Sequence, residues 1–156
     1  MEDALVGIEA PDFTLPGTDG LVHLKELQGR VVVLYFYPRD NTPGCTTEAC
    51  DFRDAYAALN EEGVVVLGVS TDSLVSHKKF RAKHQLPFPL LADEDAAVAK
   101  LYGVYKQKNM YGKVGWGVER STFVIDSDGI VRKVYRKVRV SGHVEDVRTQ
   151  VQKVRL

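Results

Sequence analysis

The chain contains two cysteines, Cys45 and Cys50, within the stretch YFYPRDNTPGCTTEACDF. Upstream of them lies a continuous apolar, β-branched and aromatic run, Val31 to Tyr37, which predicts a buried strand. Downstream, apolar residues recur at helical spacing, which predicts a helix over Thr46 to Leu59. Cys45 therefore lies where the helix begins. Unpaired backbone N–H groups and the positive end of the helix dipole favour an anion there, so we expect a reactive thiolate.

Four kinds of site are compatible with such a pair. Buried, inert cysteines are common in protein cores. A structural zinc site needs four ligands, and the histidines are scattered along the sequence, at His23, His77, His84 and His143. A thioredoxin-like disulfide reductase normally carries Cys-x-x-Cys, whereas four residues separate the cysteines here. We favour the fourth interpretation, a peroxide-reducing thiol with its own resolving cysteine.

The spacing of the two cysteines has a structural consequence. On a regular helix, residues five apart have Cα atoms about 8.6 Å apart and point roughly 140° away from each other. A disulfide needs Cα atoms within about 7 Å. Cys45 and Cys50 therefore cannot bond while the helix is intact, and we predict that its first turn or two unwinds after Cys45 is oxidised. The intervening Thr46 and Thr47 are mediocre helix formers and offer little resistance.

The elements that must position these residues follow from the rest of the pattern. Apolar runs predict strands at Phe13–Leu15, Val22–Leu24, Val64–Ser70, Leu90–Leu91, Thr122–Ile125 and Ile130–Tyr135. Helices are predicted at about 73–84, with Asp72 or Ser73 as its cap, at 96–101 and at 144–154. A glycine-punctuated loop is expected over 103–117, and His77 and His84 are expected at a surface or a helix end. This order predicts an α/β fold, with a central mixed β-sheet flanked by helices on both faces.

Composition narrows the class of protein. A chain of 156 residues fits a single domain, 1–156, that can bury a core without disulfides. Hydrophobic residues make up 44%, and no apolar run approaches the roughly 20 residues of a membrane helix. Basic and acidic residues number 21 each, so no net charge attracts nucleic acid. No secretory signal is predicted at the N-terminus, although a targeting peptide already removed would leave no trace.

The residues around Cys45 resemble the signature of the peroxiredoxins, Pro38-x-x-x-Thr42-x-x-Cys45. The run TPGCTTEAC, from Thr42 to Cys50, is similar to the bacterioferritin-comigratory, or Q-type, branch, including its resolving position. Further segments look like that branch: APDF at 10–13, LPFPLLAD at 86–93 and ERSTFVID at 119–126. The resemblance covers most of the chain. It implies a thioredoxin-like fold and the reduction of hydrogen peroxide and organic hydroperoxides, usually with electrons from thioredoxin.

The resemblance also implies roles for individual residues. Cys45 would be the peroxidatic nucleophile and Cys50 its resolving partner. Thr42 would hydrogen-bond the thiolate and the peroxide, Pro38 would shield the pocket, and Arg120 matches the active-site arginine of the family. The implied substrate-binding residues are Thr42, Gly44, Cys45 and Arg120. The segment with Met110, Tyr111 and Trp116 resembles a loop near the active site of the branch, where it either packs against substrate or covers the site.

The expected activity is that of a thioredoxin-dependent peroxiredoxin of the atypical two-cysteine type. Cys45 would form a sulfenic acid and Cys50 would resolve it as an intramolecular disulfide. The alternative is a non-enzymatic redox sensor that uses the same Cys45–Cys50 switch. We expect no metal and no organic cofactor, and as partners a hydroperoxide and thioredoxin or a similar dithiol, but no nucleic acid or membrane. Resolution within one chain favours a monomer, and thiols that must cycle favour the cytoplasm.

Overall fold

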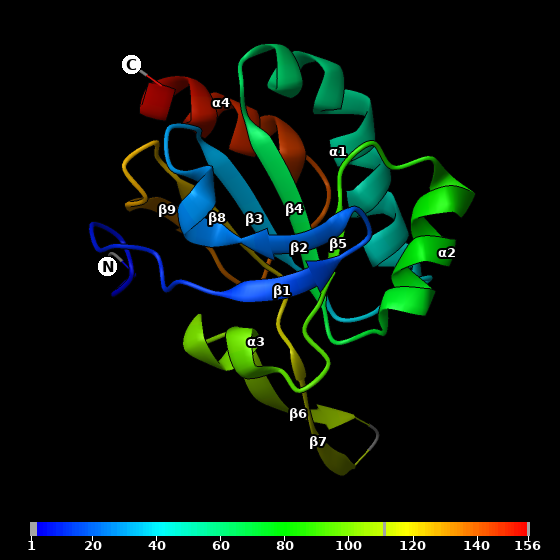
Figure 1. Cartoon of the computed structure of the whole chain (residues 1–156). Coiled ribbons are helices and arrows are strands. Elements are labelled where there is room, and N and C mark those ends of the chain that lie inside the picture. The colour runs from blue at the N-terminus through cyan, green and yellow to red at the C-terminus, as the bar shows by residue number, and fades with distance from the viewer. Residues whose placement is uncertain (1–2, 111, 156) are drawn as a thin grey trace.

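The computed structural model describes residues 3–110 and 112–155 and contains a mixed sheet with the strand order β2-β1-β5-β4-β3-β8-β9 (Figure 1). The strands of this sheet are β1 (Thr14–Gly17), β2 (Gly20–His23), β3 (Val32–Phe36), β4 (Val65–Ser70), β5 (Leu90–Ala92), β8 (Ser121–Ile125) and β9 (Val131–Tyr135). The helices are the 3-10 turn η1 (Leu24–Leu27), α1 (Pro43–Glu61), α2 (Leu74–His84), α3 (Ala97–Leu101) and α4 (His143–Arg155). None of the described helices has the length and apolarity required to cross a bilayer.

The central strand β3 divides the core into two layers. Val32, Leu34 and Phe36 belong to a cluster on one face, with the N-terminal segment and α3. The residues between them, together with Tyr37, belong to a second cluster with α1, α2 and α4. Successive strand side chains point to opposite faces, so one continuous apolar run serves both layers. The predicted mixed sheet with helices on both faces is therefore confirmed.

The strand directions bring one end of several elements to the same edge of the sheet. Strands β3, β4 and β5 are parallel, so their carboxyl ends meet at that edge. Strand β8 is antiparallel to β3, and Ser121 at its start pairs with Phe36 at the end of β3. Residues that follow β3 and residues that precede β8 therefore become neighbours, although about 80 positions separate them in the sequence.

Helix α1 begins three residues earlier than the pattern predicted. Pro43 occupies its first position, where the missing N–H of proline costs nothing, and Thr42 is the N-cap with extended backbone. The predicted cap of α2 is confirmed, because the Ser73 side chain accepts a hydrogen bond from Ser76 N.

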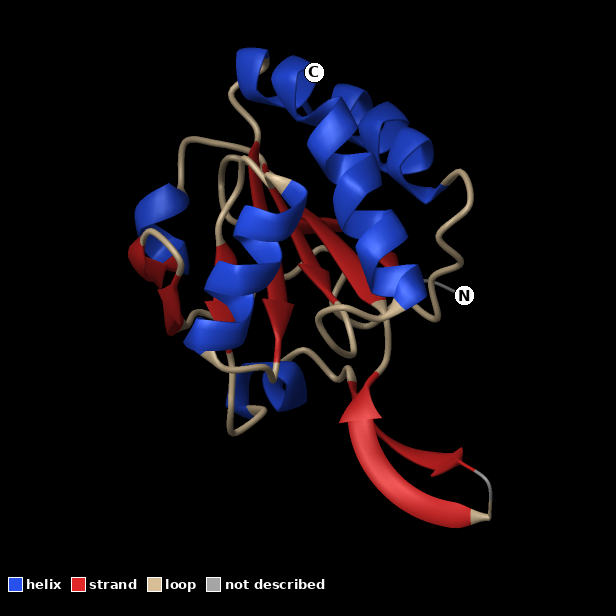
Figure 2. Cartoon of the chain, turned by 90° about the vertical axis from the view of Figure 1, so that its right-hand side faces the viewer, coloured by secondary structure: helices blue, strands red, loops and turns tan. Residues whose placement is uncertain are grey.

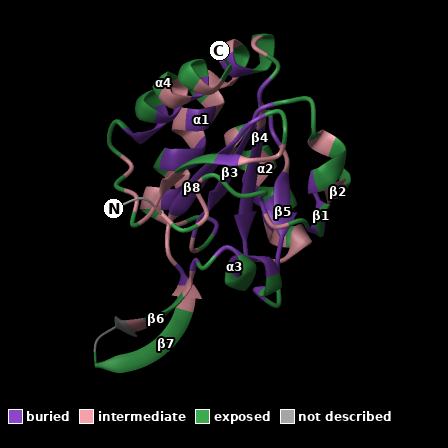
Figure 3. Cartoon of the chain, turned by 90° about the vertical axis from the view of Figure 1, so that its left-hand side faces the viewer, coloured by how far each residue is buried: buried purple, intermediate pink, exposed green. Residues whose placement is uncertain are grey.

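The expected loop at 103–117 is wrong. It is a hairpin of β6 (Tyr105–Met110) and β7 (Lys113–Val118), which projects from the body of the fold (Figure 2). Lys106 and Lys108 occupy alternate positions of β6, and Gly112 in the turn has a φ of +79°. Of the glycines that suggested a loop, Gly115 and Gly117 lie within the largely exposed strand β7 (Figure 3). Tyr105 and Trp116 stack across the ribbon at 5.8 Å between ring centroids, and Tyr111 lies outside the described residues.

Candidate active site

Cys45 is the third residue of α1, in the first turn of a 19-residue helix. The turn is closed by a hydrogen bond of 2.9 Å from Thr46 N to Thr42 O. The Cys45 side chain is 1% exposed and packs in the core layer shared by α1 and β3. The first turn of a helix is a position where free N–H groups and the positive end of the helix dipole favour a thiolate. Both cysteines are free thiols in this structure.

Arg120 reaches Cys45 from the segment that precedes β8. Its Nη2 donates to Cys45 Sγ at 3.2 Å, and its Nη1 donates to Glu48 Oε1 at 2.7 Å. Burial disfavours the charged guanidinium, but Glu48 and Cys45 outweigh this and raise the pKa of Arg120. The planar fork of the guanidinium serves two acceptors at once, which a lysine ammonium cannot do with the same geometry.

Glu48 is a site residue that the sequence reasoning missed. Its side chain is fully buried, and burial raises its pKa to about 7, although Arg120 acts in the opposite direction. Its second oxygen, Oε2, has no hydrogen-bond partner among the described residues. The spacing in the sequence could have indicated this residue, because Glu48 lies three positions after Cys45 and therefore on the same face of the helix. One cation therefore faces two groups that can each become an anion.

Gly44 leaves room for this arrangement. A Cβ atom built on Gly44 would lie 3.1 Å from Arg120 Nη2, tighter than ordinary contact. The absence of a side chain thus allows the guanidinium to approach the start of α1. Cys45, Glu48, Gly44 and Arg120 form one compact cluster, which we call the thiol cluster.

Pro38 and Thr42 lie beside the thiol cluster, on the wall of an open groove of about 840 Å³. The facing wall comes from the hairpin, including Lys108 and Trp116. The Thr42 hydroxyl donates to Arg39 O at 3.0 Å, so in this structure its proton is not directed to the thiol. Its oxygen still has acceptor capacity.

Cys50 lies on the same uninterrupted helix as Cys45 and is half-buried. The helix places their Cα atoms about 8.6 Å apart, beyond disulfide reach. The folded structure therefore keeps the two thiols separate, and a bond between them requires local unwinding.

His77 was expected at a surface or a helix end, but the structure buries it within α2, so this expectation is wrong. Its side chain is fully buried, because α2 turns His77 and Phe80 towards the sheet. Among the described residues, Asp40, Asp72 and His77 could bring three metal-ligand atoms within 4.8 Å of one another. These atoms are already engaged in hydrogen bonds, such as Asp40 N–H to Asp72 Oδ2, so the cluster is satisfied without an ion. His84 ends α2 and packs against Phe80, in line with the expectation of a helix end.

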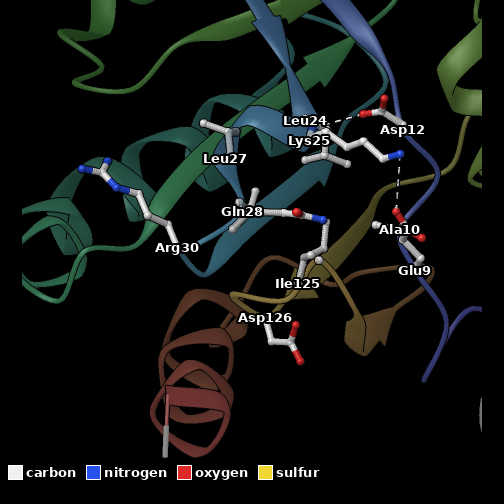
Figure 4. Close-up of a pocket in the computed structure, with 12 residues that line it drawn as sticks. Glu9, Ala10, Asp12, Leu24, Lys25, Leu27, Gln28, Arg30, Ile125 and Asp126 are labelled. Carbon is white, nitrogen blue, oxygen red and sulfur yellow. Dashed lines mark hydrogen bonds and ion pairs between the residues drawn. The ribbon is translucent and has the colours of Figure 1, made fainter.

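A separate small cavity lies between η1 and the N-terminal segment (Figure 4). Its volume is about 20 Å³, enough for about one water molecule. Figure 4 shows Lys25 between the carboxylates of Asp12 and Glu9 at its rim. None of the predicted site residues lines this cavity, so it is unrelated to the thiol cluster.

The sequence of this chain is similar to a known protein family and to named relatives. A family model described as the AhpC/TSA family matches residues 6–134. The putative peroxiredoxin bcp of Coxiella burnetii is 52% identical over 143 residues, which are 91% of this chain and 95% of that protein. Peroxiredoxin Bcp of Bacillus subtilis is 49% identical over 142 residues, which are 90% of each chain.

Solved structures show the same likeness. The bacterioferritin comigratory protein of Xanthomonas campestris, described through its alkyl peroxide reduction activity and trapped intermediate/ligand complexes, superimposes with a TM-score of 0.91. It is 39% identical and the match covers 99% of this chain and 100% of that one. A structure of peroxiredoxin Q from the same organism has a TM-score of 0.88 at 41% identity, over 92% of each chain.

Proposed function

The chain belongs to the AhpC/TSA family, in its bacterioferritin-comigratory peroxiredoxin branch, and we propose that Cys45 is the atom-transfer site of a two-cysteine peroxidase cycle. The fold is thioredoxin-like and the protein is a thiol peroxidase. The assignment of individual residues to the steps of the cycle is our proposal. The observation that carries it is the 3.2 Å hydrogen bond from Arg120 Nη2 to Cys45 Sγ at the start of α1.

In the first step, the Cys45 thiolate attacks the terminal oxygen of a hydroperoxide, ROOH. The O–O bond breaks, the sulfur becomes a sulfenic acid, and the departing alkoxide takes up a proton to leave as ROH. Arg120 donates to the sulfur and is placed to donate to the oxygens that gain charge as the O–O bond breaks. Glu48 holds the other arm of the guanidinium, so this donor is oriented before the peroxide arrives.

Ionisation of the thiol is too small an effect to account for catalysis alone. A thiol with an unperturbed pKa near 8.5 is about 3% ionised at neutral pH, so complete ionisation gains at most about 30-fold. One preorganised donor at a developing oxyanion is worth roughly 10²–10³-fold. We therefore assign most of the selectivity for peroxides to Arg120, with Thr42 and Gly44 shaping the approach to the sulfur.

In the second step, Cys50 condenses with the sulfenic acid, which releases water and forms an intramolecular disulfide. The first turns of α1 must unwind for this, because the intact helix holds the thiols too far apart. The unwinding separates Cys45 from Arg120 and so takes apart the thiol cluster. An external dithiol then attacks the disulfide, restores both thiols and lets the helix reform. Thioredoxin or a similar dithiol is the reductant that we propose, acting on a cytoplasmic monomer that forms one domain.

The test is a steady-state assay with hydrogen peroxide, thioredoxin, thioredoxin reductase and NADPH. The parent protein should sustain NADPH oxidation, and Cys45→Ser should abolish it. A redox sensor would react once with peroxide and not turn over, whereas a general disulfide reductase would reduce insulin and ignore peroxide. A parent protein that consumes no peroxide, with both thiols still free afterwards, is incompatible with the proposal.

A further inference from the structure

The segment between β3 and α1 carries Pro38 and Thr42, and one buried side chain within it is tied to a different part of the fold. This residue is Asp40, which is 4% exposed. Its backbone N–H donates to Asp72 Oδ2 at 2.8 Å, just beyond the end of β4. The next residue, Asn41, has a φ of +66°, in the left-handed region that few residues other than glycine adopt. The loop therefore takes an uncommon conformation that neighbouring contacts must hold in place.

The Asp40 carboxylate accepts three hydrogen bonds from side chains. Tyr37 Oη donates to Oδ1 at 2.6 Å, at the end of β3. Ser76 Oγ donates to Oδ2 at 2.8 Å, and His77 Nδ1 lies 2.8 Å from the same oxygen. Both of these residues belong to α2, about 37 positions away in the sequence. One carboxylate therefore joins the end of β3 to the start of α2.

Hydrogen bonds engage both members of this buried pair. His77 Nε2 lies 3.0 Å from the carbonyl oxygen of Leu91, which can only accept, so Nε2 carries a hydrogen. Burial alone would raise the pKa of Asp40, but hydrogen bonds from His77 and Tyr37 outweigh it and hold this pKa below its ordinary value. Asp40 and His77 therefore form a fully buried, hydrogen-bonded pair in which each side chain also has partners of its own.

A buried polar pair is weak evidence for stability, because desolvation of its groups offsets much of their attraction. Its stronger effect is to specify one arrangement of the groups around it. Here that arrangement concerns the catalytic loop, since Asp40 lies two residues after Pro38 and two before Thr42. The partners lie on β3, on α2 and on β5 through Leu91, which are all rigid parts of the fold.

We propose that Asp40 and His77 are positioning residues of the peroxidase, which hold the 38–42 loop so that Pro38 and Thr42 shape the path of the peroxide to Cys45. The proposal rests on the function proposed above. Neither residue touches the sulfur or the substrate. Their effect passes through the backbone of the loop, where a displacement of about 1 Å can cost roughly 100-fold in rate.

The experiment compares two reactions of Cys45 in a Cys50→Ser background, so that only one thiol reacts and no internal disulfide forms; the rate of the first oxidation, to the sulfenic acid, is the one measured. Second-order rate constants are measured with hydrogen peroxide, by rapid quenching and mass spectrometry, and with iodoacetamide. Peroxide reduction needs the oriented loop, whereas alkylation needs only an accessible thiolate. Asp40→Asn keeps the shape of the side chain but removes its charge and part of its acceptor capacity. We expect it to lower the peroxide rate 10- to 100-fold and to leave alkylation unchanged or faster.

Asp126→Asn is the matched control. Asp126 is also a buried carboxylate that accepts three hydrogen bonds, from Asp128 N, Ile130 N and Arg132 Nε, but in the turn after β8. This variant should lose thermal stability and keep both rates. The proposal is overturned if folded Asp40→Asn reacts with peroxide at the parent rate, because its role is then structural only. It is also overturned if peroxide reduction and alkylation fall by the same factor, since the change then lies in the thiolate.

Milder variants keep the test decisive if Asp40→Asn does not fold. Tyr37→Phe and Ser76→Ala each remove one hydrogen bond to the carboxylate and leave the contact between Asp40 and His77 in place. Each should lower the peroxide rate by roughly 3- to 10-fold without slowing alkylation, and parent peroxide rates in both would overturn the proposal. The Cys50→Ser reference separates this outcome from failure of the proposed function: if the reference itself does not react with peroxide, the peroxidase assignment is wrong.

Discussion

The contact from Arg120 to Cys45 can be tested by replacing the guanidinium with an ammonium. In Arg120→Lys the positive charge remains, but a single nitrogen replaces the two that now donate separately to Cys45 Sγ at 3.2 Å and to Glu48 Oε1 at 2.7 Å, so the fork geometry is lost. We expect the ammonium to pair with Glu48, because the carboxylate of Glu48 is buried and its second oxygen already has no hydrogen-bond partner among the described residues. The donor at the sulfur is therefore lost.

The size of the loss distinguishes two roles for Arg120. If Arg120 only favours the thiolate, its removal costs at most about 30-fold at neutral pH, or about 2 kcal/mol. If it stabilises the oxygen that departs from the peroxide, the expected loss is roughly 10²–10³-fold, about 2.7–4 kcal/mol. We predict a loss of at least about 100-fold in the second-order rate with hydrogen peroxide.

Rapid quenching in the Cys50→Ser background measures that rate, and iodoacetamide measures the thiolate in parallel. Alkylation should fall far less than peroxide reduction. Arg136→Lys is the control, since Arg136 forms its ion pair with Asp3 instead. Equal losses in the two reactions, both below about 30-fold, would refute the assignment of Arg120 to the transition state.

The same cluster leads to three further predictions. Gly44→Ala should lower the peroxide rate roughly 10-fold and leave the melting temperature near that of the parent. The reason is that the added Cβ would lie only 3.1 Å from Arg120 Nη2 and would push the guanidinium away. A parent rate in this variant would show that the guanidinium adapts. Cys50→Ser should form one equivalent of sulfenic acid, which mass spectrometry detects, but no internal disulfide, and it should not turn over with thioredoxin. Sustained turnover would exclude Cys50 as an obligatory resolving cysteine. Glu48 has a pKa raised to about 7 in the folded protein from about 4.5, so its contribution to stability is full below pH 4.5 and is lost as the pH rises through 7. Urea unfolding at pH 4.5 and 7.5 should therefore show a loss of up to about 3 kcal/mol that Glu48→Gln lacks, and an identical pH dependence in the two proteins would contradict the buried, titrating carboxyl.

The secondary structure of this chain was largely predictable because its apolar pattern is strong and local. The run at 31–37 has the composition of a strand buried on both faces, and Ser73 is a typical cap residue directly before α2. The hairpin was missed because lysines and glycines interrupt its strands, which leaves neither a clear strand period nor a clear helix period. Its two strands pair only with each other, outside the seven-stranded sheet, so no core-facing apolar run marks them.

The residues of the candidate site also fall into those that the sequence indicates and those that only the fold brings together. Cys45 and Cys50 could be singled out from the sequence because their chemistry depends on the helix start and on their spacing along the chain. Thr42, Pro38 and Arg120 came from resemblance to a family, and nothing local links Arg120 to Cys45. Glu48 could have been inferred from helical periodicity, but its burial and its raised pKa depend on what covers it.

The sequence by itself indicated which residue would carry the reactive sulfur, that a helix starts beside it, and that the second thiol lies too far along that helix to bond without unwinding. These are consequences of local geometry. Only the tertiary structure decided what surrounds the sulfur. The antiparallel pairing of β3 with β8 brings Arg120 next to Cys45. The parallel order of β3, β4 and β5 brings His77 into hydrogen-bond distance of Asp40. Such contacts join residues 37 to 75 positions apart, and their distances, burial and charge follow from how the strands pair and the helices pack.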